Sequence, residues 1–214
     1  MIEIKNVSKT FGSQQILKNI NIEILENEKV VLLGQNGAGK SSLIKVILGE
    51  YIPDKGYVKI LGTDPLKSRK EALDNISFVP QTPPPLRLTL SELCEFVCES
   101  SQVSLEDIEQ ICERMGLKLK DNLNKAFYKL SGGMKQKLLI AIAFAKDSKI
   151  MIFDEPTANL DIDAREQFLA LLNEFAKEKT IIFISHRVSD MRGFINREIY
   201  MDLGAVVQET RRAS

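Results

Sequence analysis

The sequence predicts an α/β fold in which a mostly parallel sheet is flanked by helices. Three short runs, at residues 30–33, 150–153 and 181–184, are apolar throughout, which is typical of strands buried on both faces. Segments of helical periodicity lie between these runs. Residues 2–7 and 16–25 instead alternate apolar and polar side chains, so they predict an additional antiparallel β layer at the N-terminus.

The composition favours a globular protein without a general affinity for nucleic acid. The chain has 214 residues, of which 44% are hydrophobic and 27% charged, which suits one large domain or a domain with a small insertion. Lys plus Arg (29) equals Asp plus Glu (29), whereas a non-specific nucleic-acid binder carries a strongly basic field. No nucleic-acid partner is therefore expected.

The sequence shows no signal of secretion or membrane insertion. Residues 1–5 contain no basic segment followed by an apolar core, and no apolar run approaches the roughly 20 residues that cross a bilayer. We therefore expect a cytoplasmic protein. If it serves a membrane process, it is expected to be peripheral on the cytosolic face.

A change of character in the middle of the chain predicts an inserted helical subdomain. Three consecutive prolines at residues 83–85 form a rigid extended stop. Helices are expected at 91–99 and 104–115, each opened by a serine cap. The predicted organisation is a single domain over residues 1–214, with a core at about 1–81 and 129–214 and a helical subdomain at about 82–128.

The three cysteines, Cys94, Cys98 and Cys112, are expected to be reduced thiols, because their number is odd and no secretion signal precedes them. Cys94 and Cys98 are spaced to share one face of a helix. A metal site is conceivable, but three thiols without a nearby histidine make a poor zinc set. Small buried apolar side chains are the favoured interpretation.

A phosphate-binding loop follows the first buried run. The pattern G-x-x-x-x-G-K-[ST] is matched without a mismatch, between an apolar strand and a helix. Its glycines let the backbone wrap around phosphates, Lys40 is placed to bridge the β- and γ-phosphates, and Ser41 to hold Mg²⁺. ATP and Mg²⁺ are therefore the expected cofactors. The predicted contacts are Gly34, Gln35, Asn36, Gly37, Ala38, Gly39, Lys40, Ser41 and Ser42.

Two carboxylates close the second buried run and complete the expected catalytic set. Asp154 ends this strand, where an acidic residue reaches the Mg²⁺ shell beside a phosphate loop. Glu155 comes next and is the expected general base that polarises the attacking water. ATP hydrolysis is the predicted reaction.

With these motifs and the segment Leu130-Ser131-Gly132-Gly133-Met134, the chain resembles nucleotide-binding subunits of the ATP-binding cassette (ABC) transporter family over nearly its whole length. The resemblance makes this fold a P-loop NTPase. It implies that Ser131, Gly132 and Gly133 bind the γ-phosphate of ATP held by a second subunit. A serine and two glycines that open a helix are consistent with anion binding.

Four further roles are implied by the resemblance alone. Gln81 resembles the glutamine that touches Mg²⁺ and the attacking water, and His186 the switch histidine at the γ-phosphate. Asp161 resembles the aspartate of the D-loop at the dimer interface, and Phe11 stands where an aromatic ring packs against adenine.

Two departures from the family pattern were found near these motifs. Met134 replaces the more frequent glutamine, which is similar to export-type subunits and favours export over import. Asn159 replaces a glycine that many members have before the D-loop, which affects the expected interface geometry and not the nucleotide site.

The resemblance implies an ATPase subunit that powers a membrane transporter. ATP binding closes a dimer, expected to be a homodimer, and hydrolysis opens it. The implied partner is a separately encoded membrane-spanning permease that docks between residue 81 and about residue 96. The alternative is a soluble or division-type ABC ATPase that remodels a ribosomal, nucleic-acid or membrane complex without transport. The transported substrate is not predicted by the sequence.

Overall fold

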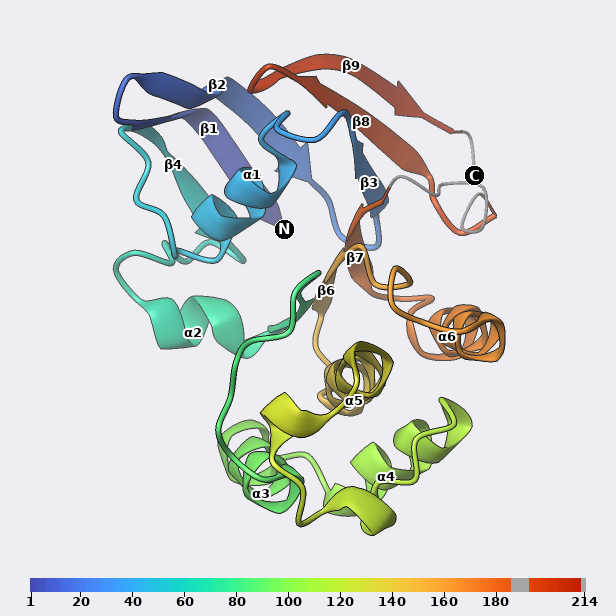
Figure 1. The fold of residues 1–214 in the computed structure, drawn as a ribbon. Coiled ribbons are helices and arrows are strands. Elements are labelled where there is room, and N and C mark those ends of the chain that lie inside the picture. Colours follow the sequence, from blue (N-terminus) through green and yellow to red (C-terminus); the bar gives the residue numbers. More distant parts are fainter. Residues whose placement is uncertain (186–192, 213–214) are drawn as a thin grey trace. The chain divides into compact units, whose positions relative to one another are not determined.

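The computed structural model describes residues 1–185 and 193–212, and these form two compact units. The first unit comprises Met1–Ile76 and the chain from Glu178 onward, and the second comprises Ser77–Lys177. Strands and helices alternate along the chain, so the α/β class predicted by the sequence is confirmed (Figure 1). Each unit is described separately.

An antiparallel sheet of order β2-β1-β4 forms the N-terminal layer of the first unit (Figure 1). Ile2 pairs with Ile24 in β2 and with Ile60 in β4, and Ile4 pairs with Ile22. These isoleucines are at most 4% exposed, so the alternating pattern of the sequence places one face of the sheet in the core. The strands are β1 (Ile2–Phe11), β2 (Gln14–Ile24) and β4 (Lys55–Ile60).

The same unit holds strands of the mostly parallel sheet, in the order β7-β3-β8-β9. β3 is parallel to both β7 and β8, and the last strand, β9, is antiparallel to β8. β7 is buried along its whole length and β3 at all but its last residue, as the apolar runs require. The elements are β3 (Lys29–Leu33), α1 (Lys40–Ile47), α2 (Arg69–Asp74), β7 (Thr180–Ile184), β8 (Arg197–Asp202) and β9 (Ala205–Arg211).

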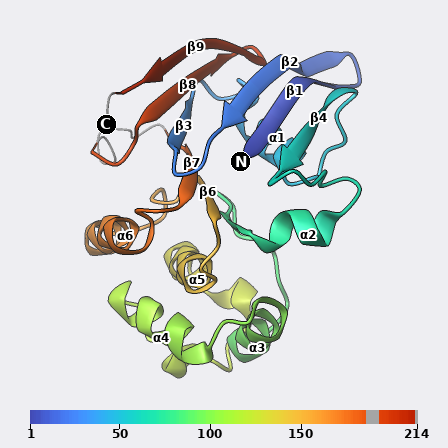
Figure 2. The same cartoon turned by 180° about the vertical axis from the view of Figure 1, so that it is seen from behind.

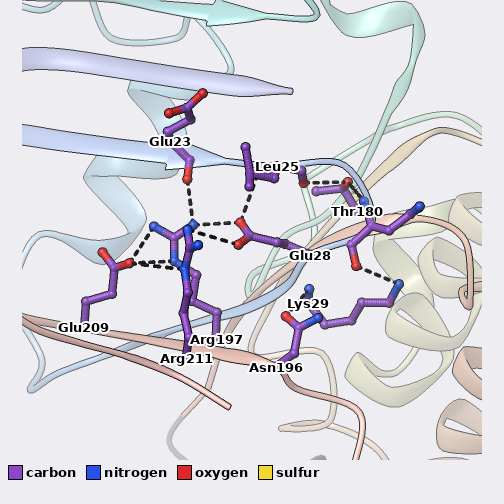
Figure 3. A network of polar contacts seen from close by, with 10 residues as sticks. Glu23, Leu25, Glu28, Lys29, Thr180, Asn196, Arg197, Glu209 and Arg211 are labelled. Atoms are coloured by element: carbon purple, nitrogen blue, oxygen red, sulfur yellow. Dashed lines mark hydrogen bonds and ion pairs between the residues drawn. The ribbon is translucent and has the colours of Figure 1, made fainter. Parts of the chain in front are cut away.

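A buried ion-pair network joins the chain before β3 to the beginning of β8 (Figure 3). The side chain of Arg197 is 3% exposed and lies between the carboxylates of Glu28, at 2.7 Å, and Glu209, at 2.9 Å. Arg197 also donates to the backbone carbonyl of Glu23 at 2.6 Å. Arg211 reaches the second oxygen of Glu28 at 3.3 Å. Two carboxylates and one backbone carbonyl thus balance the buried positive charge of Arg197.

The second unit is mainly helical. It contains the two neighbouring strands β5 and β6, and helix α5 packs on both α4 and α6 (Figure 2). Phe153 of β6 packs against Phe168 of α6 and Phe144 of α5 with ring centroids 5.3 Å and 5.9 Å away, which forms the core of this unit. The elements are β5 (Ile76–Val79), α3 (Leu90–Ser101), α4 (Leu105–Arg114), η1 (Lys120–Asn122), η2 (Phe127–Lys129), α5 (Gly132–Ala145), β6 (Ile150–Asp154) and α6 (Ile162–Phe175).

The expected cap of the first inserted helix was wrong. The helix α3 begins at Leu90, and Thr89 caps it in a reciprocal capping box with Glu92. Ser91, the expected cap, is a helical residue. The other expected cap is present, because the Ser104 hydroxyl accepts a hydrogen bond from the Asp107 amide at the start of α4.

Candidate functional site

The phosphate loop lies between β3 and α1 in the first unit, which is the strand–loop–helix context that the motif requires. Gly34 leaves β3 with φ 140°, and a Cβ at this position would overlap the backbone carbonyl oxygen of Met201. Only glycine permits this close approach of β8 to the loop. The loop backbone is therefore held in place by a neighbouring strand of the same unit.

Lys40 opens α1 and folds back over the loop. It is 6% exposed, and its Nζ donates hydrogen bonds to the carbonyl oxygens of Gly34 at 2.7 Å and Gln35 at 2.9 Å. The first turn of α1 contains no acidic residue, and Gly39 at the N-cap has no side chain that could cap it. A cation beside the positive end of a helix is unfavourable unless an anion joins it. This arrangement therefore fits the phosphates of ATP.

Ser41 and Ser42 follow Lys40 in the first turn of α1, and Ser41 is exposed. Its hydroxyl is the group that holds Mg²⁺ in the sequence prediction. The exposure leaves this serine accessible from solvent at the mouth of the loop.

Phe11 is the last residue of β1 and is 45% exposed. Its ring contacts the ring of Tyr51 edge-on, with centroids 4.9 Å apart, and the Lys9 ammonium lies 5.1 Å from its centroid. An exposed, laterally supported aromatic ring suits stacking against a planar base. Sequence analysis missed Tyr51, because no local pattern links it to Phe11.

The two acidic candidates lie at the end of β6 in the second unit. Asp154 is 7% exposed, and Glu155 directly follows the strand. Glu155 adopts φ 48°, a left-handed conformation that costs a non-glycine residue about 1–2 kcal/mol. Such strain is concentrated at functional sites and re-aims a side chain at the end of a strand. Gln81 also belongs to this unit, two residues beyond β5, and is exposed.

Ser131, Gly132 and Gly133, which resemble the ABC signature, lie at the start of α5. The Ser131 hydroxyl accepts a hydrogen bond from the Met134 amide at 3.2 Å, and Ser131 and Gly132 are both exposed. A Cβ at Gly133 would lie 3.0 Å from the backbone oxygen of Asn159. The N-terminus of α5 therefore packs tightly on the segment that leads to Asp161.

Asp161 caps α6, and its Oδ1 accepts a hydrogen bond from the Ala164 amide at 2.8 Å. Its Oδ2 pairs with the Nζ of Lys137 on α5, also at 2.8 Å. The hydrogen bond from Lys137, followed by that from the Ala164 amide, lowers the pKa of Asp161 below its ordinary value. Lys137 was not among the residues expected from the sequence.

The candidate residues thus form separate groups. The first unit brings together the phosphate loop, Lys40 and Ser41. The second unit brings together Ser131–Gly133, Asn159 and Asp161, and also contains Gln81, Asp154 and Glu155. His186 lies outside the described residues.

Two of the three cysteines follow the favoured interpretation, whereas Cys98 is only partly buried. Cys94 and Cys112 are buried, and burial raises the pKa of the Cys94 thiol to about 11 and that of Cys112 to about 12. Within the described ranges, no group of three or more His, Cys, Asp or Glu side chains is arranged to hold a metal ion.

Comparison with known proteins defines the family. The ABC transporter family matches residues 17–158. The chain is 32% identical to the glutamate/aspartate import ATP-binding protein GltL of Escherichia coli K12, over 98% of this chain and 90% of that protein. It is also 32% identical to the glutathione/L-cysteine transport system ATP-binding/permease protein CydC of the same organism, over 99% of this chain and 38% of that protein.

Solved structures give the same result. A dimeric post-hydrolysis ATP-binding cassette bound to ADP and Pi is 29% identical, with a TM-score of 0.85 and coverage of 100% of both chains. The ATP-binding subunit of an ABC transporter has a TM-score of 0.87 at 28% identity, over 98% of this chain and 89% of that chain.

Fold and site define a cassette that binds and hydrolyses ATP with Mg²⁺. The chain belongs to the ABC transporter family, whose ATPase cassettes power membrane transport through ATP-driven dimer closure. Similarity is equal to an import subunit and to a fused ATP-binding/permease protein, so it reflects the cassette that both share. None of the helices in the described ranges has the length and apolar character of a membrane-spanning segment.

Proposed function

We propose that this chain is a separately encoded ATPase subunit that sits on the cytosolic face of a membrane-spanning permease and works as a homodimer. One observation carries the proposal: the chain bears two helix N-termini suited to anions, at α1 and at α5. In a head-to-tail dimer, the phosphate loop of one copy and Ser131–Gly133 of the other enclose one ATP.

In this proposal the first unit holds the nucleotide. Phe11 stacks on adenine, the loop amides and Lys40 hold the β- and γ-phosphates, and Ser41 ligates Mg²⁺. When bound, Mg²⁺ neutralises charge that develops on the phosphates. The resemblance to the family assigns the remaining roles: Asp154 and Gln81 toward the metal, Glu155 as the base for water, and His186 toward the γ-phosphate.

In the proposed dimer, ATP hydrolysis drives the separation of the two copies. The γ-phosphate contacts Ser131–Gly133 of the opposite copy, and Asp161 lies at the same interface. Loss of that phosphate removes the shared contacts, and the two copies separate. We assign the docking of the permease to the segment between Gln81 and Phe96, where Leu88 is 39% and Phe96 62% exposed. Direction of transport is assigned to export, because Met134 resembles export-type signatures.

Co-purification tests this function. The tagged chain is recovered from detergent-solubilised membranes of its source cells, with Phe96→Asp as the variant that disrupts the assigned docking segment. Recovery of a multi-span membrane protein with the parent chain, and its loss with Phe96→Asp, is the expected result. Recovery of ribosomes or nucleic acid in its place would contradict the transporter assignment.

A further inference from the structure

The ion pair between Lys137 and Asp161 does more than join two helices. We propose that Lys137 is a positioning residue, which fixes residues 159–161 against α5 in the geometry that a second copy of the chain must meet. The proposal rests on the ATP-bound homodimer proposed above and names the side chain that prepares one of its contact surfaces.

The environment of Lys137 is unlike that of an ordinary surface lysine. Its side chain is only 13% exposed, whereas that of Asp161 is 60% exposed. A Cβ at Gly116, just beyond the end of α4, would lie 3.7 Å from the Lys137 Nζ. The ammonium therefore lies where the C-terminus of α4, which favours positive charge, approaches α5 and the start of α6. Its aliphatic stem is packed, so the charge has little freedom.

Asp161 is held through both carboxylate oxygens. One accepts from the Ala164 amide and fixes the start of α6, and the other accepts from Lys137 and fixes the distance to α5. The hydrogen bonds from Lys137 and from the Ala164 amide hold the pKa of Asp161 below its ordinary value, which favours the charged carboxylate that the ion pair requires.

One face of α5 contacts both ends of the segment 159–161. Gly133 and Lys137 are one helical turn apart and share a face. Gly133 makes the close backbone approach to Asn159, and Lys137 makes the ion pair to Asp161. The face of α5 that carries Gly133 thus also positions the segment that contains Asp161.

The segment 159–161 and the residue after it expose side chains to solvent. Asn159 is exposed, and Ile162, the residue after Asp161, is 72% exposed. Leu160, which lies between them in the sequence, is 4% exposed, so its buried side chain holds the segment in the core. Without Lys137, Leu160 still holds the segment, but Asp161 can turn away from α5, and this weakens its cap on α6 as well. Binding a second copy must then order it again.

The experiment measures dimerisation in ATP and Mg²⁺ by sedimentation equilibrium, with Glu155→Gln in every variant to prevent turnover. In this background we expect Lys137→Met to weaken the dimer about tenfold, because each of two symmetric interfaces must order its own segment. Lys137→Arg should restore most of the affinity, because arginine keeps the charge and the reach.

The matched control is Arg114→Met. Arg114 pairs with Glu174 at 2.7 Å in the same unit, with side chains 35% and 54% exposed. This variant also removes an ion pair between two helices of the unit, but it should leave dimerisation unchanged. ATP affinity of the dilute monomer should also be unchanged by Lys137→Met, because the phosphate loop belongs to the other unit.

The outcomes separate the two proposals. A Lys137→Met protein that dimerises like its parent overturns the positioning role, and so does a Lys137→Arg protein that is as weak as Lys137→Met. A parent that stays monomeric with ATP overturns the homodimer itself, together with the inference built on it. In the folded monomer, we also expect the Ala164 amide to exchange hydrogen faster in Lys137→Met but not in Arg114→Met, because Asp161 then caps α6 less firmly.

Discussion

Replacing Arg197 with methionine is expected to lower the free energy of unfolding by about 3 kcal/mol or more. Removing one partner of a buried ion pair costs about 3–5 kcal/mol, because the remaining charge stays desolvated without compensation. Here the remaining charge is on Glu28, whose side chain is 13% exposed and is only partly compensated by Arg211 at 3.3 Å, and the carbonyl of Glu23 loses its donor as well (Figure 3). Glu209 is 37% exposed and can be hydrated, which favours the lower end of the range.

The network provides its own control. Arg211 contacts the same two glutamates at 3.3 Å and 3.8 Å, but its side chain is 56% exposed. Pairs of this kind contribute about 0–1 kcal/mol. Arg211→Met should therefore change the free energy of unfolding by less than about 1 kcal/mol, although it removes the same formal charge.

The assay is urea denaturation followed by circular dichroism, with ATP affinity measured on the folded variants. The denaturant slope should be unchanged, because the substitution is not expected to alter the surface that unfolding exposes. The network precedes β3, whereas the phosphate loop follows it, a separation of roughly 16 Å along five residues of strand. ATP affinity should therefore be preserved. Equal destabilisation by Arg197→Met and Arg211→Met would refute the reasoning.

Two further predictions concern the phosphate loop and the thiols. Gly34→Ala should lower the free energy of unfolding by at least about 3 kcal/mol and abolish ATP binding, because its Cβ meets a backbone carbonyl. Gly37→Ala should lower it by only about 1–2 kcal/mol, because no atom lies within 4 Å of the added Cβ. The same denaturation and binding assays measure both variants. Equal losses would contradict the overlap. At pH 8, Cys94 and Cys112 should resist a thiol reagent until urea exposes them, because pKa values of about 11 and about 12 leave the thiolate scarce. The contribution of the protonated thiols to stability is fully present below the pKa of the unfolded thiol and is lost as the pH rises from there toward the folded values of about 11 and about 12, so alkaline pH should lower the urea midpoint. Rapid native labelling of both cysteines would contradict their burial.

Local patterns in the sequence predicted much of the fold. The wholly apolar runs correspond to β3, β6 and β7, and the glycine-rich motif lies between a strand and a helix. Alternation predicted the beginning of β1 but not its length. The strand continues to Phe11 through register shifts after Ile4 and Val7, and such bulges change which face each side chain occupies.

Features with weak or non-local signals were missed. The helix α2 has six residues, of which only Ala72 is buried, so it has no apolar periodicity to detect. The cap of α3 was readable, because Thr89 and Glu92 match the capping-box spacing. Lys137 and Asp161 are 24 residues apart on different helices, and their contact depends on how α5 and α6 pack. No local rule of sequence predicts such a pair.

The central claim is that ATP holds two copies of this chain together and that hydrolysis releases them. The most direct test is the molar mass in solution of the Glu155→Gln variant with Mg²⁺ and either ATP or ADP. Twice the monomer mass in ATP, a monomer in ADP, and loss of ATP turnover are the predicted results. A monomer in both nucleotides, an equal dimer in both, or near-normal turnover by this variant would contradict the account.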